Sequence, residues 1–528
     1  MRIEIYDTTL RDGAQGEGVS FSLVDKNNIT NKLNALGVDF IEGGYPLSNP
    51  KDVAYFDQCR VLNLTNSRIC AFGMTRRRGL EAEQDEGMKA LVATGASVIT
   101  LVGKSWDLHV DEVLQVDRDE NLQMIADSVT FCRQAGREVF YDAEHFFDGF
   151  RANPTYAMAT LTAAAEAGAN RLILCDTNGG SLPDWVSEVV QRVRGELKVA
   201  LGIHTHNDCG VAIANTLAAV QAGCIQVQGT MNGIGERCGN ADLTTIVANL
   251  RLKMGYDCLL GDAVSSLARL TKTSRYIYEL ANINTPANQP FVGSSAFAHK
   301  GGMHVHGVRR VSHSYEHIEP DLVGNSRRIL VSELSGASNV AAMLGKKFDI
   351  SDDHQIQRRI VERVQQLEHE GFQYEAATAS FELLVQDLLD TRTSFWNLDH
   401  YRCVILKRQD EAAVTEAIVK LNVNDKTEHH VADGDGPVNA LDGALRKCLE
   451  PHYPHIKQVH LRDYRVRVVN PTAESAAKVR VIAEFSIQNQ IDKANLTHFS
   501  TIGVNENIVD ASWQALCDAF NYYLIESS

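Results

Sequence analysis

The triplet His204-Thr205-His206 is the sharpest chemical signal in the sequence. It ends a predicted β-strand, where side chains two residues apart point to the same side, with backbones roughly 6–7 Å apart. Two imidazoles so placed can converge on one divalent ion, and Asp12 offers a carboxylate to the same centre. Asn207 and Asp208 follow directly and are candidates to fix the tautomer of the rings.

One aspartate and two histidines leave coordination positions open for water or substrate. This is typical of a catalytic rather than a structural metal site. Nitrogen and oxygen ligands suit Zn, Mn, Co or Mg, and the choice among these metals stays open. A histidine pair that binds no metal is the alternative.

Three further residues could act beside such an ion. Arg11 could stabilise negative charge that develops on a carbonyl oxygen, or it could simply form an ion pair with Asp7 or Glu42. Glu144 would be an unpaired carboxylate in a closed site and is a candidate for proton transfer. The hydroxyl of Thr177, with nearby backbone N–H groups, could bind a substrate carboxylate.

These residues need a scaffold, and residues 1–255 supply one by alternating short β-rich runs with amphipathic helical segments. Eight βα units in this length predict a (β/α)8 TIM barrel. A doubly wound open sheet is the alternative, but it would carry a glycine-rich turn after its first strand, where this chain has DTTLRDG. The predicted strands cover residues 3–7, 40–46, 68–75, 97–103, 138–146, 171–179, 199–208 and 225–233.

Polar residues fall at or just after the carboxyl ends of these strands, the face where TIM barrels gather their chemistry. They are Asp7, Arg11, Asp12, Glu42, Glu144, Asp176, His204, His206 and Asn232.

The rest of the chain predicts two more regions after a barrel over residues 1–270. Residues 271–385 are rich in helical patterns and are expected to form an α-helical linker that reaches back to the barrel mouth. Residues 386–528 repeat the order βββα twice and predict a separate α/β domain. A groove between its halves could hold a small ligand, and a plain dimerisation module is an equal alternative.

Composition excludes several partners. The formal charge of −16 argues against nucleic acid and anionic membranes, which usually need a basic face. No apolar run approaches the roughly 20 residues of a membrane span, and the amino terminus lacks the order of a secretory signal. The 11 cysteines include no CxxC pair and are expected to be small buried residues. A cytosolic protein is expected.

Several of these motifs together resemble a known family. DTTLRDG at Asp7–Gly13, HTHND at His204–Asp208 and NGIGERCGN at Asn232–Asn240 resemble the signatures of the metallolyase-type TIM barrels, which include 2-isopropylmalate, homocitrate and citramalate synthases. The segments Gly293–Gly307 and Asp433–Leu445 resemble the linker and the regulatory domain of these synthases. The resemblance therefore spans nearly the whole chain.

This resemblance implies a metal site and a condensation reaction. Asp12, His204 and His206 would bind the metal, with Asn240 completing the site directly or through water. Acetyl-CoA would lose a methyl proton, the resulting enolate would attack a 2-keto acid, and hydrolysis of the thioester would release CoA.

Residue roles in the reaction follow from the same resemblance. Arg11 would polarise the carbonyl of the keto acid and Thr177 would hold its carboxylate, with Glu42 as a further residue on the substrate side. Glu144 with His304 would form the base machinery, assisted by Tyr315. In the synthases the linker of one subunit covers the barrel of the other, which implies a homodimer with His304 acting in trans. Metal binding by the HVH triplet or a solvated loop position are the alternatives for His304.

The resemblance also indicates which 2-keto acid accepts the acetyl group. The segments Gly13–Ser22 and Val139–Phe150 most resemble the citramalate branch, which implies pyruvate as acceptor and a place in isoleucine biosynthesis. Ala14, Gly16 and Glu17 depart from the isopropylmalate pattern, whose acceptor is 2-oxoisovalerate. The carboxy-terminal domain would bind isoleucine or leucine as a feedback inhibitor.

Two other functions compete with condensation. A lyase that cleaves a hydroxyacyl-CoA could use the same barrel, but such lyases lack an extension like the one beyond residue 256. A metal-bearing amino-acid sensor without activity is the other alternative, and the complete set of candidate catalytic side chains argues against it.

Overall fold

The computed structural model describes residues 1–330, 337–345, 347–469, 477–487 and 497–527. Parts of two expected regions thus lie outside the described residues: 331–336 and 346 of the linker, and 470–476 and 488–496 of the second repeat. The chain forms two compact units, one of residues 1–297 with 317–327 and one of residues 298–316 with 328–528. We call them the first and the second unit.

The first unit is built on a closed barrel in which the strands follow one another in sequence order. Every pair of neighbours is parallel, and β1 closes the circle by pairing with β8. The predicted (β/α)8 barrel is therefore confirmed. Its strands are β1 (Glu4–Asp7), β2 (Phe40–Glu42), β3 (Arg68–Met74), β4 (Val98–Lys104), β5 (Glu138–Glu144), β6 (Arg171–Asp176), β7 (Ala200–Thr205) and β8 (Gln226–Gly229).

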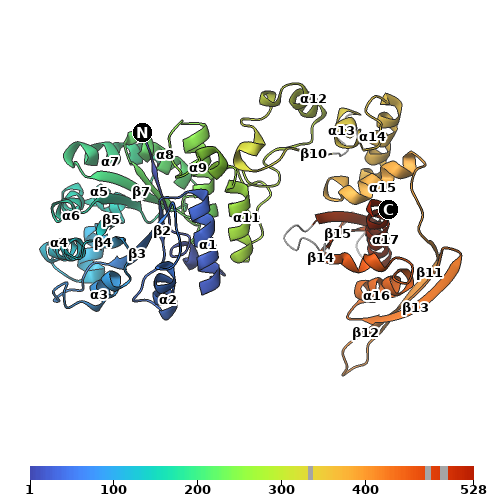
Figure 1. Cartoon of the computed structure of the whole chain (residues 1–528), viewed down its shortest axis with the longest axis horizontal. Coiled ribbons are helices and arrows are strands. Elements are labelled where there is room, and N and C mark those ends of the chain that lie inside the picture. Colours follow the sequence, from blue (N-terminus) through green and yellow to red (C-terminus); the bar gives the residue numbers. More distant parts are fainter. Residues whose placement is uncertain (331–336, 346, 470–476, 488–496, 528) are drawn as a thin grey trace. The chain divides into compact units, whose positions relative to one another are not determined.

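Helices surround the strands, as Figure 1 shows. The helices between the strands are α1 (Leu23–Leu36), α2 (Pro50–Cys59), α3 (Glu86–Ala93), α4 (Arg118–Gln134), α5 (Phe146–Ala152), α6 (Pro154–Glu166), α7 (Pro183–Glu196) and α8 (Ala212–Ala222). α9 (Leu243–Leu252), α10 (Ala263–Leu267) and α11 (Leu270–Leu280) continue the first unit.

Local sequence explains where these helices begin and end. Ser22 and Asp25 form a reciprocal capping box at the start of α1, and Gly37 ends it in the left-handed conformation at φ 93°. A β-carbon at Gly37 would lie 2.2 Å from the carbonyl oxygen of Leu260, so this position requires glycine for space as well as for conformation.

The strand alternation decides what fills the barrel. Alternate side chains of each strand point inward. Tyr6, Phe40, Cys70, Val98 and Phe140, from five neighbouring strands, form one buried cluster. The inward positions nearer the carboxyl ends are polar instead. The barrel interior is therefore packed towards the amino ends of the strands, and the polar candidate residues lie at the carboxyl ends.

The second unit begins with helical segments around a two-stranded parallel sheet. Its elements here are β9 (Ala298–His299), α12 (Gly302–Arg310), β10 (Arg328–Ile329), α13 (Ala337–Leu344), α14 (His354–His369) and α15 (Thr378–Leu388). The predicted α-rich character of this part of the chain is confirmed.

The remainder of the second unit consists of two βββα repeats, as predicted. The first is β11 (Asn397–Leu406), β12 (Val414–Val423), β13 (Lys426–Gly434) and α16 (Pro437–Leu449). The second is β14 (Val459–Val468), β15 (Val479–Ile487), β16 (Thr497–Asn505) and α17 (Ile508–Glu526). Each has an antiparallel three-stranded sheet, and β11 and β14 carry a register shift at corresponding places, between residues 398 and 400 and between 461 and 463. The inner faces of both sheets and both helices share one hydrophobic core.

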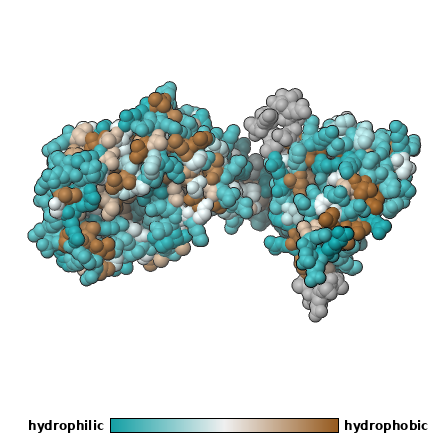
Figure 2. Space-filling model, turned by 90° about the horizontal axis from the view of Figure 1, so that it is seen from below, coloured by the Kyte–Doolittle hydropathy of each residue, from teal (hydrophilic) through white to brown (hydrophobic). Residues whose placement is uncertain are grey.

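No helix among the described residues is long and apolar enough to cross a bilayer. Figure 2 shows hydrophobic residues scattered among hydrophilic ones on the face in view.

Candidate active site

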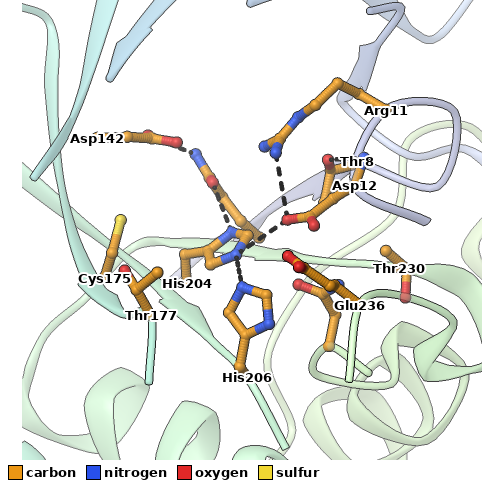
Figure 3. Close-up of polar contacts among 12 residues, drawn as sticks. Thr8, Arg11, Asp12, Asp142, Cys175, Thr177, His204, His206, Thr230 and Glu236 are labelled. Carbon is orange, nitrogen blue, oxygen red and sulfur yellow. Dashed lines mark hydrogen bonds and ion pairs between the residues drawn. The ribbon is translucent and has the colours of Figure 1, made fainter. Parts of the chain in front are cut away.

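Asp12, His204 and His206 meet at the carboxyl ends of β1 and β7, and all three are buried. The Nε2 atom of His204 lies 3.3 Å from Oδ2 of Asp12 and 3.3 Å from Nε2 of His206 (Figure 3). The ligand atoms of the three residues all lie within 4.8 Å of one another. The predicted cluster is therefore assembled from segments far apart in the sequence.

The charge states of Asp12 and His206 suit a cation. Burial opposes ionisation of Asp12, but the neighbouring Arg11 and His204 hold the pKa of its carboxyl well below its ordinary value. Burial, together with the adjacent His204, lowers the pKa of His206 to about 4. At neutral pH the cluster thus offers a carboxylate and a neutral imidazole, the forms that bind a metal ion.

Asn240 supplies a test of whether a metal ion fits. Its backbone pairs with that of His206 in an antiparallel bridge, and its side chain is buried. The side-chain oxygen accepts no hydrogen bond from any described residue. A buried carbonyl oxygen left unpaired costs about 1–3 kcal/mol. Two imidazoles, a carboxylate and this amide oxygen form a donor set that fits a divalent ion.

His204 is held from behind by Gln228. The Nδ1–H of His204 donates to Oε1 of Gln228 at 3.1 Å, and Nε2 of Gln228 donates to Oδ1 of Asp142 at 3.1 Å. His204 and Gln228 are partners in the register of β7 and β8. This chain of bonds turns Nε2 of His204 towards the cluster. Although burial opposes it, the hydrogen bond and charge of Asp12 raise the pKa of the His204 ring. Burial, with the charge of Glu42 adding to it, raises the pKa of Asp142 to about 7.

The prediction that Asn207 and Asp208 fix the ring tautomer is wrong. The side chain of Asn207 accepts from the backbone N–H of Ala212, and Asp208 forms an ion pair with Arg237 at 2.8 Å. Both side chains serve the loops that follow β7 and β8, and Gln228 takes the expected place behind His204.

Arg11 lies between the cluster and a buried acid. Its Nε donates to Glu42, its Nη1 lies 3.4 Å from Oδ2 of Asp12, and its guanidinium carbon lies 3.9 Å from the ring centre of Phe72. The ion pair with Glu42 that competed with a catalytic role is therefore present. Because it engages only one edge of the guanidinium, the other edge remains directed towards the cluster.

Glu42 is fully buried and saturated with donors. Besides Arg11, its carboxylate accepts from the hydroxyl of Tyr6 at 2.5 Å and from that of Thr8 at 2.7 Å. This position favours an action through Arg11, whose orientation Glu42 fixes, over the direct substrate contact expected from the sequence.

Glu144 is not the unpaired carboxylate that the sequence predicted. It forms an ion pair with Lys104, its partner in the register of β4 and β5. A lysine one strand away cannot be inferred from the residues that flank Glu144 in the chain. The pair keeps a cation beside the candidate base.

Thr177 lies just past β6, where its hydroxyl accepts from the backbone N–H of His145 at 2.9 Å. Arg237 donates to its carbonyl oxygen at 2.7 Å. The hydroxyl hydrogen of Thr177 is thereby free to donate to a ligand, which agrees with the expected role towards a carboxylate.

Three of the polar residues expected at the mouth hold the fold instead. The Asp7 carboxylate accepts from the backbone and hydroxyl of Thr9, and Asp176 accepts in the same way from Ser181. Asn232 donates to a backbone carbonyl of α11.

A cavity of about 360 Å³ is lined by most of the predicted site residues of the barrel, but not by Glu42 or Asn240. Its polar lining includes the metal cluster, and its apolar lining comes from β3, β4 and β6. The lining residues are Arg11, Asp12, Gln15, Phe72, Met74, Val102, Lys104, Asp142, Glu144, Cys175, Thr177, His204, His206, Glu236 and Arg237.

His304 and Tyr315 belong to the second unit, and the structure brings them together. Their rings stack with centroids 4.3 Å apart and an interplanar angle of 24°. Both side chains are exposed. Their expected partnership with Glu144 stays a prediction.

Sequence reasoning missed Lys104, Asp142 and Gln228. Each stands at an inward position of its strand, in the alternation that also places Glu144 and His204 inward. A polar residue inside an otherwise apolar buried strand is the signal that could have revealed them.

Three family models cover the chain in order. The HMGL-like family matches residues 2–277. A family described as homocitrate synthase post-HMGL domain-like matches residues 291–371, and the LeuA allosteric (dimerisation) domain matches residues 375–524.

Curated relatives match over the full length. The (R)-citramalate synthase of Geobacter sulfurreducens is 47% identical, over 99% of this chain and 98% of that protein. The one of Synechocystis is 48% identical, over 98% and 96%. A 2-isopropylmalate synthase of Methanocaldococcus jannaschii is 29% identical, over 99% and 95%. The barrel and its metal-binding cluster define the class, a metal-dependent enzyme of the HMGL-like type. On its full-length identity to them, the chain belongs to the (R)-citramalate synthase family.

Proposed function

We propose that this protein condenses acetyl-CoA with pyruvate to give (R)-citramalate and CoA. The observation that carries the proposal is the assembly of Asp12, His204, His206, Arg11 and Glu144 around one cavity in a chain of this family. Two relatives named as 2-isopropylmalate synthase and probable 2-isopropylmalate synthase are 29% and 30% identical. For this reason 2-oxoisovalerate is the second candidate acceptor and pyruvate the first.

The keto acid is bound by residues at one end of the cavity. Asp12, His204 and His206, with Asn240, would hold a divalent ion, which supplies Lewis acidity towards the ketone when bound. The free edge of the Arg11 guanidinium donates to the ketone oxygen, where negative charge develops during the addition. The hydroxyl of Thr177 donates to the carboxylate of the keto acid.

Proton removal falls to Glu144. Its carboxylate takes a proton from the acetyl methyl group, and the ion pair with the adjacent Lys104 orients that carboxylate. The enolate carbon then forms a bond to the ketone carbon, and water hydrolyses the thioester to release CoA. His304 and Tyr315, stacked on each other, join this machinery from the partner subunit of a homodimer.

The apolar lining suits a small acceptor. Phe72, Met74 and Val102 form an apolar surface of the cavity that could contact the methyl group of pyruvate. A pocket discriminates by about 1–3 kcal/mol per methylene, so a larger acceptor should react measurably but more slowly.

The carboxy-terminal part of the second unit is the regulatory part of the proposal. The match to the LeuA allosteric (dimerisation) domain supports a homodimer and an amino-acid effector, isoleucine or leucine. We propose a barrel over residues 1–270, a linker over 271–385 and a regulatory domain over 386–528. A cytoplasmic location and a place in isoleucine biosynthesis belong to the same proposal.

A panel of keto acids tests the function. Metal-replete protein is incubated with acetyl-CoA and pyruvate, 2-oxobutyrate, 2-oxoisovalerate or 2-oxoglutarate, and released CoA is trapped as a thiol. The highest kcat/KM is expected with pyruvate. A preference for 2-oxoisovalerate would establish the alternative, and no keto-acid-dependent release would refute condensation. Cleavage of a hydroxyacyl-CoA in parallel assays would instead indicate a lyase.

A further inference from the structure

One face of the second repeat gathers three arginines around a cavity. Arg465 and Arg467 lie on β14 and Arg480 on β15, and they line a cavity of about 280 Å³. The other lining residues are Gln373, Ala376 and Ile482, so no described carboxylate forms part of its wall. In a chain with a formal charge of −16, a cavity whose charged lining residues are all cations is unexpected.

The register of the strands makes this arrangement costly. Arg467 lies directly opposite Arg480 in the antiparallel pairing of β14 and β15. Opposed side chains share one face with Cβ atoms about 4.5–5.5 Å apart, and like charges at that distance destabilise a sheet. Burial lowers the pKa of Arg480, and although Glu368 opposes this, the charge of Arg467 adds to it.

Arg480 is anchored on one side only. Its Nε donates to the carbonyl oxygen of Gly371, and its Nη1 donates to Oε1 of Gln373 at 2.8 Å. These bonds hold the guanidinium against the segment 371–376, which links α14 to α15. Its Nη2 is not used by them and remains available to the cavity.

The other two arginines differ in how far they are neutralised. Arg465 pairs with Asp463 at 2.9 Å and lies 3.9 Å from a carboxylate oxygen of Glu484. Arg467 makes no hydrogen bond or ion pair with any residue that the structure describes, so none of those residues uses its planar fork of donors. A free guanidinium fork matches the paired oxygens of a phosphate or carboxylate group.

We propose that this cavity binds a small oxyanion, with Arg467 taking two of its oxygens and Arg480 a third. The anion neutralises the cross-strand pair and ties the segment 371–376 to β14 and β15. Phosphate and dicarboxylates both offer several negatively charged oxygens to such guanidinium groups. The proposal is independent of the condensation reaction, because no residue of the barrel takes part.

Thermal unfolding and calorimetry of the full chain test the proposal. Inorganic phosphate or succinate is titrated at constant ionic strength, with chloride as the reference anion. We expect a saturable rise in Tm of about 2–4 °C with at least one of the two anions. The anion that gives a saturable rise in Tm shows whether the cavity prefers phosphate or a dicarboxylate. Calorimetry should show that this anion binds at least tenfold more weakly to Arg467→Ala.

Two controls separate binding from a structural role. Arg408→Ala, at an exposed position between β11 and β12, should keep the response of the unchanged protein. Without either anion, Arg467→Ala should unfold at the same or a higher temperature, because the repulsion from Arg480 is gone. An equal response in Arg467→Ala, a lower Tm of that variant in chloride, or no saturable response to either anion would each overturn the proposal.

Discussion

His204 donates from Nδ1 to the side-chain oxygen of Gln228 at 3.1 Å, across the register of β7 and β8. A residue without any contact to the substrate cavity thus sets which nitrogen of His204 faces Asp12 and His206.

Replacing Gln228 with leucine should weaken the metal site without removing a ligand. Without the acceptor behind it, His204 can rotate or adopt the other tautomer, and we expect metal affinity to fall about 10–100-fold. Competition with a chelating dye measures the change. Gln123→Leu, at an exposed position of α4, is the matched control. Unchanged metal affinity in Gln228→Leu would show that the bond is incidental.

Arg11→Lys should retain the metal and lose turnover. The compact ammonium of lysine cannot reproduce the planar fork of donors with which Arg11 pairs with Glu42 at one edge and faces the cluster with the other. We expect kcat to fall about 10²–10³-fold, as for the loss of one donor to a developing oxyanion. Metal content and steady-state kinetics are measured on the same preparation. Normal turnover would remove Arg11 from the mechanism.

Lys104→Met should slow the reaction through Glu144. The variant keeps the length of the side chain but leaves the carboxylate of Glu144 without its ion pair. A general base contributes about 10²–10⁴-fold. Because Lys104 only orients this base, we expect kcat to drop by about tenfold or more, but by no more than that contribution. Lys89→Met removes an exposed ion pair on α3 and should leave kcat unchanged. Equal rates in both variants would contradict the role of Lys104.

Asp518 predicts a pH dependence of stability in the second unit. Burial raises the pKa of its carboxyl from 3.8 to about 6, although Ser380 and Arg392 favour the charged form. The folded state therefore binds the proton more tightly than the unfolded state. Stability should increase by about 2 kcal/mol as the pH falls through 6 towards 3.8, and this gain is absent above pH 6.

Asp518→Asn isolates this effect because it keeps the shape of the side chain and removes its titration. The difference in Tm between the unchanged protein and the variant is measured from pH 7.5 to 5, and it should shift in favour of the unchanged protein as the pH falls. Asp387→Asn, on the exposed carboxylate that pairs with the same Arg392, is the control. A difference in Tm that is constant over this range would refute the assignment.

The sequence was sufficient to predict the barrel and the cluster of Asp12, His204 and His206. Strand periodicity and polar residues at strand ends predict which face of a parallel barrel is functional, and this places Asp12 beside His204. The two repeats of the second unit could be predicted for a similar reason, since the order βββα recurs along the chain.

Side-chain contacts between neighbouring strands could not be predicted from the sequence. The expectations that Asn207 and Asp208 fix a ring tautomer and that Glu144 is unpaired were wrong because partners were sought along the chain. The real partners of His204 and Glu144 are Gln228 and Lys104, each one strand away in register. Register depends on how far each strand is shifted against its neighbour, which local patterns do not specify.

The metal content of the purified protein tests the central claim most directly. Unchanged protein should bind about one divalent ion per chain, and CoA release from acetyl-CoA and pyruvate should rise in proportion to the bound metal. His204→Ala, folded by circular dichroism, should bind no ion and show no turnover. Full turnover after complete removal of divalent metal, or an unchanged metal content in His204→Ala, would contradict the account.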